Sequence, residues 1–260
     1  MRLSIDAFLD YGFPEPADVL LQIEAAALPD QWLEAQSLVI ESDHPIRAVS
    51  GEEGIGQRTW ATAEHRLVAH YRAVVEIRRM TPPLAALPHT PAGLLPPQTI
   101  PYLLPSRYCE SHRFDHFLRR SFGGLRGGDL AVALSEWVRT NIDYDGVGSD
   151  GRSSALDTFA ERRGVCRDFA HLLVALARAG EIPARCVAAY APGVEPPDFH
   201  AVVELWLGGA WHLIDPTGMA HADEIARVCV GRDATDIAFM TIFGSAWLQQ
   251  QRVSVTRLPD

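Results

Sequence analysis

The sequence contains no lysine, and all 23 of its basic residues are arginines. The chain therefore has no side-chain primary amine and cannot cross-link itself through lysine. Acidic residues number 33, which gives a formal net charge of -10. A nucleic-acid-binding protein needs a basic face, and no basic run with interleaved aromatic residues occurs here. These absences exclude nucleic acid as an expected partner.

Long apolar runs are missing as well. No segment approaches the ~20 consecutive apolar residues of a membrane span, and the first 30 residues lack the basic and apolar regions of a secretory signal. The cysteines are far apart and form no CxxC pair, whereas structural zinc sites usually bring their ligands in close pairs. We therefore expect free thiols, no metal and a cytoplasmic location without membrane contact. The cysteines are Cys109, Cys166, Cys186 and Cys229.

The chain of 260 residues is long enough for one large domain or two modest ones. Its first 79 residues show several runs in which apolar and polar side chains alternate, most clearly over residues 67–77. Alternation of this kind predicts half-buried strands. We therefore expect residues 1–80 to form an all-β domain of the sandwich or barrel type.

A proline-rich stretch follows, with eight prolines in residues 80–105. Proline at this density blocks both a helix and a central strand. The same stretch carries too many leucines for a free linker. We expect residues 81–105 to run along the surface and to connect the β domain with a second domain at 106–260.

The second domain begins with helical patterns. Asp129 is predicted to cap the first helix, Ser154 and Asp157 resemble a capping box, and a third helix is expected from Cys166 to Gly180. The period then changes to two, which predicts strands at 185–191, 200–207, 210–215, 227–230 and 250–257. Helices followed by antiparallel strands indicate an α+β domain with the cysteine helix packed on the sheet.

Cys166 is expected at a helix N-terminus, where unpaired N–H groups and the helix dipole favour a negative charge. A thiolate in such a position is a better nucleophile near neutral pH. A lone cysteine is more often a small buried hydrophobe, so the functional interpretation depends on its neighbours.

A hairpin supplies those neighbours. Gly208 and Gly209 predict a two-residue turn, and counting back from it places Val202 opposite Asp215. His200 lies two residues before Val202 and points to the same face, so its imidazole and the Asp215 carboxylate are diagonal neighbours. A three-residue loop would instead move Asp215 to the other face.

Cysteine, histidine and aspartate in this order are the parts of an activated thiol nucleophile. His200 would accept the thiol proton and donate it to the leaving amine, while Asp215 would orient the imidazole. The backbone N–H of Cys166 would stabilise the oxyanion, and Tyr144 is a candidate for the second donor.

Residues 164–171, 198–201 and 211–217 resemble, in this order, the three motifs of the transglutaminase-like superfamily. The segments 104–109 and 231–244, with the amino-terminal β region, are similar to its bacterial branch, often described as cysteine proteases. The resemblance implies a papain-like core with the cysteine, histidine and aspartate named above as catalytic triad. The acidic calcium-site sequences of animal transglutaminases are not apparent, so we expect no cofactor.

The sequence thus predicts a thiol hydrolase that acts on amide or peptide bonds of a peptide or protein through a covalent acyl-enzyme. One alternative is transfer of the acyl group to an amine, as in protein-glutamine cross-linking. Another is a catalytically silent binding or assembly module that keeps the fold, and a zinc site is a third.

Several nearby residues are expected to be structural. A charge on Asp168 would raise the pKa of a neighbouring thiol, so we expect Asp168 to be paired with Arg163 or Arg167. His171 is expected to pack rather than to react.

Overall fold

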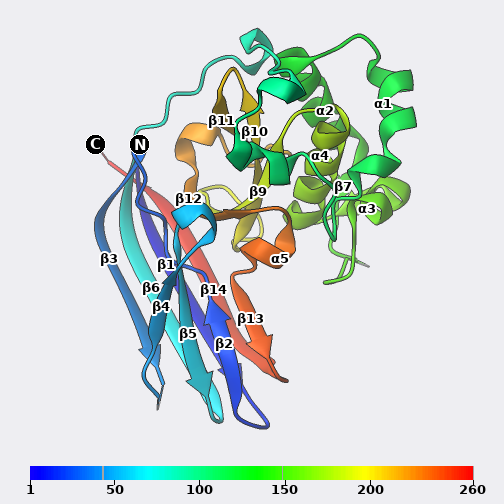
Figure 1. Ribbon diagram of the computed structural model, residues 1–260. Helices are drawn as coiled ribbons and strands as arrows, with labels where there is room; N and C mark the ends of the chain where they lie inside the picture. Colours follow the sequence, from blue (N-terminus) through cyan, green and yellow to red (C-terminus); the bar gives the residue numbers. More distant parts are fainter. Residues whose placement is uncertain (43, 148, 260) are drawn as a thin grey trace.

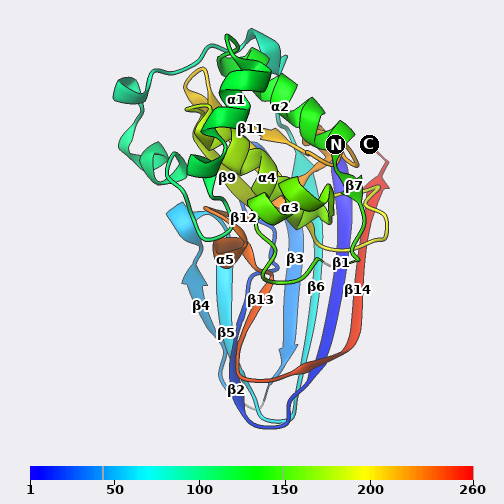
Figure 2. The same cartoon turned by 90° about the vertical axis from the view of Figure 1, so that its right-hand side faces the viewer.

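The computed structural model of the chain describes residues 1–42, 44–147 and 149–259. It contains a long β sandwich and, above it in Figure 1, a core of helices packed on a twisted sheet. Figure 2 shows helix α4 (Cys166–Ala179) lying across that sheet. The chain is therefore an α+β protein with an amino-terminal β region.

Alternating apolar residues build the sandwich. Its two four-stranded antiparallel sheets have the orders β14-β1-β6-β3 and β13-β2-β5-β4. Along β1, Leu3, Ile5, Ala7 and Leu9 are at most 1% exposed and face a core that both sheets share. The strands from the first part of the chain are β1 (Arg2–Gly12), β2 (Ala17–Leu21), β3 (Gln31–Glu41), β4 (Arg47–Ser50), β5 (Gln57–Ala63) and β6 (Arg66–Ile77).

The last two strands belong to the sandwich and correct the sequence-based assignment. Strand β13 (Met240–Phe243) pairs with β2, and β14 (Trp247–Leu258) pairs with β1 along nearly its whole length. The prediction that residues 250–257 extend the sheet of the second domain is therefore wrong. Alternation predicts that a strand has one buried face, but it does not encode which distant strand supplies its hydrogen bonds.

The proline-rich segment crosses the surface of the helical core in short 3-10 turns. The Gly128 N–H donates to the Leu87 carbonyl, and the Gly208 N–H donates to the Pro88 carbonyl. The segment is thereby tied to both a helix and the core hairpin. Its turns are η2 (Leu84–Ala86), η3 (Ala92–Leu94) and η4 (Pro97–Tyr102).

One helix begins earlier than the sequence predicts. Arg126 is the N-cap of α2, and Asp129 lies inside the first turn rather than capping it. This start has no side-chain cap, and the Leu87 carbonyl of the proline-rich segment accepts from the Gly128 N–H of the first turn instead. The segment packs so closely that a Cβ at Gly128 would lie 1.7 Å from the Leu84 carbonyl oxygen. The capping box of Ser154 and Asp157 at α3 is present as predicted. The helices preceding α4 are α1 (Asp115–Phe122), α2 (Gly127–Asn141) and α3 (Ala155–Glu161), with the 3-10 turn η5 (Ser111–Arg113) before them.

The core sheet has the antiparallel order β11-β10-β9-β12. The hairpin turn consists of Gly208 and Gly209, whose φ angles of 58° and 85° favour glycine. Its register pairs Leu207 with Ala210, as predicted. Strands of this sheet are β9 (Ala184–Tyr190), β10 (His200–Leu207), β11 (Ala210–Ile214) and β12 (Ala226–Gly231). The remaining elements are η1 (Glu52–Gly54), η6 (Ala222–Glu224), the short helix α5 (Ala234–Ile237) and a parallel pair of β7 (Asp143–Tyr144) with β8 (Arg163–Gly164).

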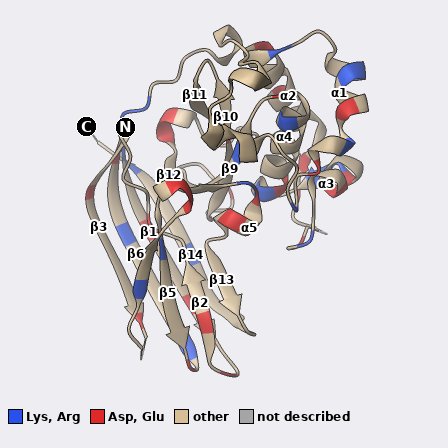
Figure 3. Cartoon of the chain, viewed as in Figure 1, with Lys and Arg blue, Asp and Glu red and all other residues tan. Residues whose placement is uncertain are grey.

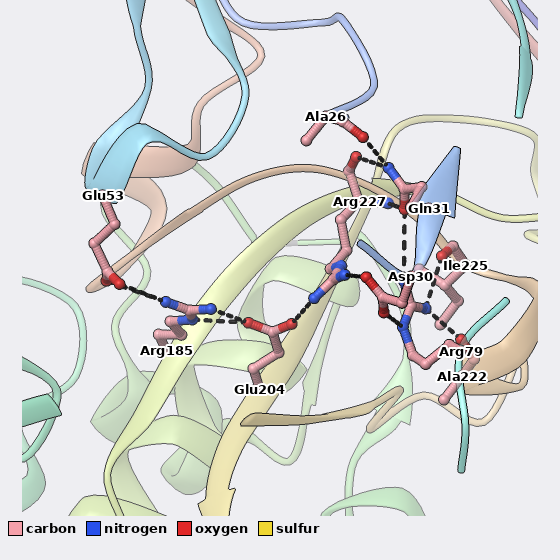
Figure 4. Close-up of polar contacts among 10 residues, drawn as sticks. All are labelled: Ala26, Asp30, Gln31, Glu53, Arg79, Arg185, Glu204, Ala222, Ile225 and Arg227. Atoms are coloured by element: carbon pink, nitrogen blue, oxygen red, sulfur yellow. Dashed lines mark hydrogen bonds and ion pairs between the residues drawn. The ribbon is translucent and has the colours of Figure 1, made fainter. Parts of the chain in front are cut away.

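A buried network of charges joins the core sheet to the sandwich (Figure 4). Glu204 on β10 is 1% exposed and forms ion pairs of 2.6 Å with both Arg185 and Arg227. Arg185 continues to Glu53 at 3.0 Å, and Arg227 continues to Asp30, two residues of the amino-terminal region. The two parts of the molecule are therefore connected by partly buried ion pairs that extend from the fully buried Glu204.

Charges of both signs are interspersed over the core and the strands (Figure 3). Within the described residues, no helix has the length and apolar character that crossing a membrane requires.

Candidate active site

Cys166 is the first residue of α4, and Val165 is its N-cap. The preceding strand β8 brings the chain to this point through Gly164. A Cβ at Gly164 would lie 2.6 Å from the Asp168 Cβ, which leaves space only for glycine. The sequence thus places a thiol at the positive end of the most buried helix of the core, as predicted.

Asp168, which is 1% exposed, closes the first turn of that helix. Its carboxylate accepts from the Val165 N–H at 2.9 Å and from the Ser149 hydroxyl at 2.5 Å. Arg167 forms an ion pair with it at 3.1 Å. The predicted partner Arg167 is confirmed, whereas Arg163 pairs with Glu161 instead. The charge of Asp168 is therefore compensated close to the thiol.

His200 and Asp215 meet as the hairpin register predicts. Nε2 of His200 lies 2.9 Å from Oδ2 of Asp215, and the two side chains are 0% and 1% exposed. The carboxylate is held further by the Thr217 N–H at 2.9 Å, the Thr217 hydroxyl at 2.7 Å and the Ala220 N–H at 3.0 Å. The loop that follows β11 thus fixes the orientation of the aspartate.

Electrostatics favour a charged pair. Burial by itself would lower the pKa of His200, but hydrogen bonding to Asp215 and the neighbouring Cys166 thiol outweigh it and raise that pKa to about 10. The pKa of Asp215 is raised by burial, but hydrogen bonds from His200 and Thr217 leave it below its usual value. Nδ1 of His200 is buried and has no hydrogen-bond partner among the described residues. The imidazole is therefore held at Nε2 and unengaged at Nδ1.

Cys166 and His200 share a cleft of about 510 Å³ that lies where α4, the core sheet and the α5–β13 segment meet. Its walls are mainly apolar and include Ala188, Phe199 and Phe239. The rings of Phe199 and Phe239 stack with centroids 4.4 Å apart. The cleft is large enough for a peptide side chain and the adjoining amide.

Tyr144 on β7 stands beside the same cysteine. Its hydroxyl neighbours both the backbone N–H and the thiol of Cys166; burial and the thiol charge raise the pKa of Tyr144 to about 12. The hydroxyl therefore keeps its proton at neutral pH. The parallel pairing of Tyr144 with Gly164 delivers the ring to this position.

Other residues weighed in the sequence lie outside this arrangement. His171 belongs to α4 and is fully buried; its Nε2 accepts from the Ala234 N–H at 3.0 Å and its ring stacks on Tyr108. Cys109, Cys186 and Cys229 are free and buried. In residues 1–42, 44–147 and 149–259, no cluster of three or more His, Cys, Asp or Glu side chains is arranged to hold a metal ion.

Sequence reasoning missed the residues that form the far wall of the cleft. Segments 107–108 and 234–241 contribute there, together with Asp198. Segments 104–109 and 231–244 are similar to the bacterial branch of the transglutaminase-like superfamily. That similarity drew attention to these segments, but it did not indicate that they line the cleft.

Comparisons with known proteins identify the family and the fold. Residues 100–216 match the transglutaminase-like superfamily. The structure of a protein from Cytophaga hutchinsonii, described as a putative cysteine protease, superposes with a TM-score of 0.90 at 31% identity, covering 100% of this chain and 91% of that one. The uncharacterized protein ML0607 of Mycobacterium leprae is 38% identical over 117 residues, so the match spans only 41% of each chain. The chain belongs to the transglutaminase-like superfamily.

Proposed function

We propose that this protein is a thiol enzyme that cleaves amide or peptide bonds through a covalent acyl-enzyme. One observation carries the proposal: His200 is tied to Asp215 through Nε2, while its free Nδ1 is buried in the cleft that contains the Cys166 thiol. Nδ1 of His171 also lacks a partner, but that ring lies outside the cleft lining, whereas His200 lines the cleft together with Cys166. An imidazole with one nitrogen held and the other open suits proton transfer.

In the proposed reaction the Cys166 proton is held on His200, whose raised pKa favours the protonated imidazole, and the sulfur attacks the amide carbonyl carbon. The tetrahedral intermediate collapses when the imidazolium donates its proton to the leaving amine and the C–N bond breaks. Water then attacks the thioester with His200 as base. The C–S bond breaks, the acid departs and the thiol is restored.

The oxyanion needs donors that are already in place. The Cys166 N–H at the start of α4 is one, and the Tyr144 hydroxyl beside it is the second. One such donor typically contributes about 3 kcal/mol to transition-state stabilisation. Tyr144 can serve because the direction of its pKa shift keeps it protonated.

Hydrolysis is the favoured outcome, and the relative from Cytophaga hutchinsonii supports it through its description as a protease. Transfer to an amine uses the same groups and is the second candidate. The chain has no lysine, so an acceptor would be an external amine. A silent binding module is the remaining alternative.

Mass spectrometry tests the chemistry directly. Wild type and Cys166→Ala are incubated with cell extract, acid-quenched and compared for an acyl adduct on the peptide that contains residue 166. We expect an adduct only on the wild type, and a fluorescent primary amine added to the extract distinguishes aminolysis from hydrolysis by the product mass.

Thiol alkylation gives a second readout that requires no substrate. We expect iodoacetamide to modify Cys166 selectively below about pH 8 and His200→Ala to slow it strongly. His212→Ala is the control, because that ring bonds the Leu207 carbonyl and lies outside the cleft lining. Equal alkylation of wild type and His200→Ala would contradict the enzymatic proposal.

A further inference from the structure

Asp198 is a carboxylate on the cleft wall, two residues before His200. The Phe199 N–H donates to its Oδ1 at 2.7 Å, and the Gln251 side-chain amide donates to the same oxygen at 2.5 Å. None of the described residues donates a hydrogen bond to Oδ2 or forms an ion pair with Asp198. The carboxylate is thus oriented by neutral donors and keeps one oxygen available.

The cationic side chains of the cleft are engaged elsewhere, and the His200 imidazole is paired with Asp215. Of the two arginines on its walls, Arg167 is engaged with Asp168 and with Ser149 at 2.8 Å, and Arg107 lies over the Tyr108 ring at 5.0 Å. Partial burial raises the pKa of Asp198, as expected for a carboxylate without a cationic partner.

The charge acts across the cleft. It raises the pKa of Tyr144 beside Cys166 and that of Tyr11 on the sandwich. The Asp198 carboxylate has no cationic partner and lies close enough to Tyr144 to affect its pKa. It can therefore bind a cationic group of a substrate that occupies the cleft.

Resting on the proposed function, we infer that Asp198 selects substrates that carry a positive charge, an ammonium or a guanidinium group, next to the amide bond attacked by Cys166. The apolar wall around Phe199 would receive the rest of the substrate, and Oδ2 would accept from the cation.

The sandwich has a part in this recognition. Gln251 belongs to β14, which pairs with β1 of the amino-terminal region. Its amide fixes the carboxylate from outside the core, so Gln251 is a positioning residue. This contact explains how the β region contributes to specificity without carrying the reacting groups.

Charged thiol reagents test the inference without a known substrate. The rates at which Cys166 reacts with trimethylammonium-ethyl and sulfonatoethyl methanethiosulfonate are measured at low ionic strength. In Asp198→Asn we expect the cation-to-anion rate ratio to fall by about 3- to 10-fold, and added salt to reduce the difference. The matched control is Glu195→Gln, since Glu195 is exposed on the same loop but outside the cleft lining.

Iodoacetamide is neutral, so it reports the reactivity of Cys166 without any effect of charge selection by Asp198. It therefore separates the proposed enzymatic function from the inferred role of Asp198. If Cys166 is reactive toward it in both proteins but the charged-reagent ratio is the same in wild type and Asp198→Asn, the inference is wrong and the proposed function stands. If Cys166 lacks enhanced reactivity in the wild type, the proposed function fails first. Asp198→Glu should restore part of the ratio, and Gln251→Ala should lower it less than Asp198→Asn does.

Peptidyl chloromethyl ketones then identify the source of the cation. Alanyl-phenylalanyl chloromethyl ketone is compared with its N-acetylated form to test an amino-terminal ammonium. N-acetyl-lysyl and N-acetyl-norleucyl chloromethyl ketones test a side-chain ammonium. We expect the cationic member of at least one pair to inactivate the wild type several-fold faster and to lose that advantage in Asp198→Asn; equal rates within both pairs would overturn the inference.

Discussion

Strand β10 carries two buried ionisable side chains, His200 and Glu204, which differ in how completely their polar atoms are hydrogen-bonded. At its start His200 bonds Asp215, and four residues later Glu204 bonds Arg185 and Arg227. Both oxygens of Glu204 are engaged by arginines. His200 has one nitrogen engaged and the other, Nδ1, without a partner among the described residues.

The difference is one of location and of hydrogen-bond partners, since both side chains are buried. His200 lines the cleft beside the thiol, whereas Glu204 connects the core to the sandwich and lies outside the cleft lining. Buried charges need partners. In the network around Glu204, all of these partners are side chains of the protein itself. The pair at the cleft retains an atom for a reacting partner. Burial and charge alone therefore do not distinguish a structural cluster from a candidate catalytic one.

The largest expected effect comes from disrupting the ion-pair network of Glu204 with Arg185 and Arg227. Glu204→Gln leaves two buried arginines without their shared counter-charge, and we expect it to lower the free energy of unfolding by about 3 to 5 kcal/mol. Urea denaturation measures the change. The surface ion pair of Glu136 with Arg139 provides the control, and Glu136→Gln should leave the midpoint unchanged. Equal midpoints for the two variants would contradict the structural role of the network.

Disrupting the His200–Asp215 pair should change the reactivity of Cys166 more than the stability of the protein. Asp215→Asn removes the acceptor that holds Nε2 of His200, and we expect iodoacetamide modification of Cys166 to slow by roughly 10- to 100-fold. Asp223→Asn, at an exposed site in the following loop, is the control. A large loss of stability without a loss of reactivity would place Asp215 with the structural clusters.

The pH dependence of stability should distinguish the two groups as well. The pKa of His200 rises from an ordinary 6.5 to about 10 on folding, so between these values the folded state keeps a proton that the unfolded chain has lost. Its contribution is complete below pH 6.5 and disappears as the pH rises through 10. We expect the stability difference between wild type and His200→Ala to shrink by about 2 kcal/mol between about pH 7 and 9. Urea titrations at several pH values measure it; a difference that stays constant or grows would contradict the shift.

The smallest effect is expected at the first turn of α4. Arg167→Gln leaves the Asp168 carboxylate uncompensated near the thiol, and we expect alkylation of Cys166 to slow by a few-fold, or about 1 kcal/mol. The double variant Arg167→Gln/Asp168→Asn should recover the rate. Arg163→Gln is the control because its partner Glu161 lies on the surface. An unchanged rate in Arg167→Gln would show that the ion pair does not affect the thiol.

Local sequence predicted most of the elements, because their signals lie within a few residues of each other. The two glycines of the hairpin determine the register that places His200 near Asp215. The helix start at Cys166 follows from the apolar period and Gly164. The predictions failed where a distant segment decides: α2 begins before Asp129, where a backbone carbonyl of the proline-rich segment accepts from the Gly128 N–H.

The sequence alone therefore determined the residues of the candidate site and their order, since turn chemistry and periodicity are local properties. Only the tertiary structure decided what surrounds them. Strand β14 joins β1 rather than the core sheet, and so carries Gln251 to Asp198. The free nitrogen of His200 is likewise visible only once every neighbour is in place. Pairings across more than 200 residues depend on the packing of the whole chain, which no local pattern encodes.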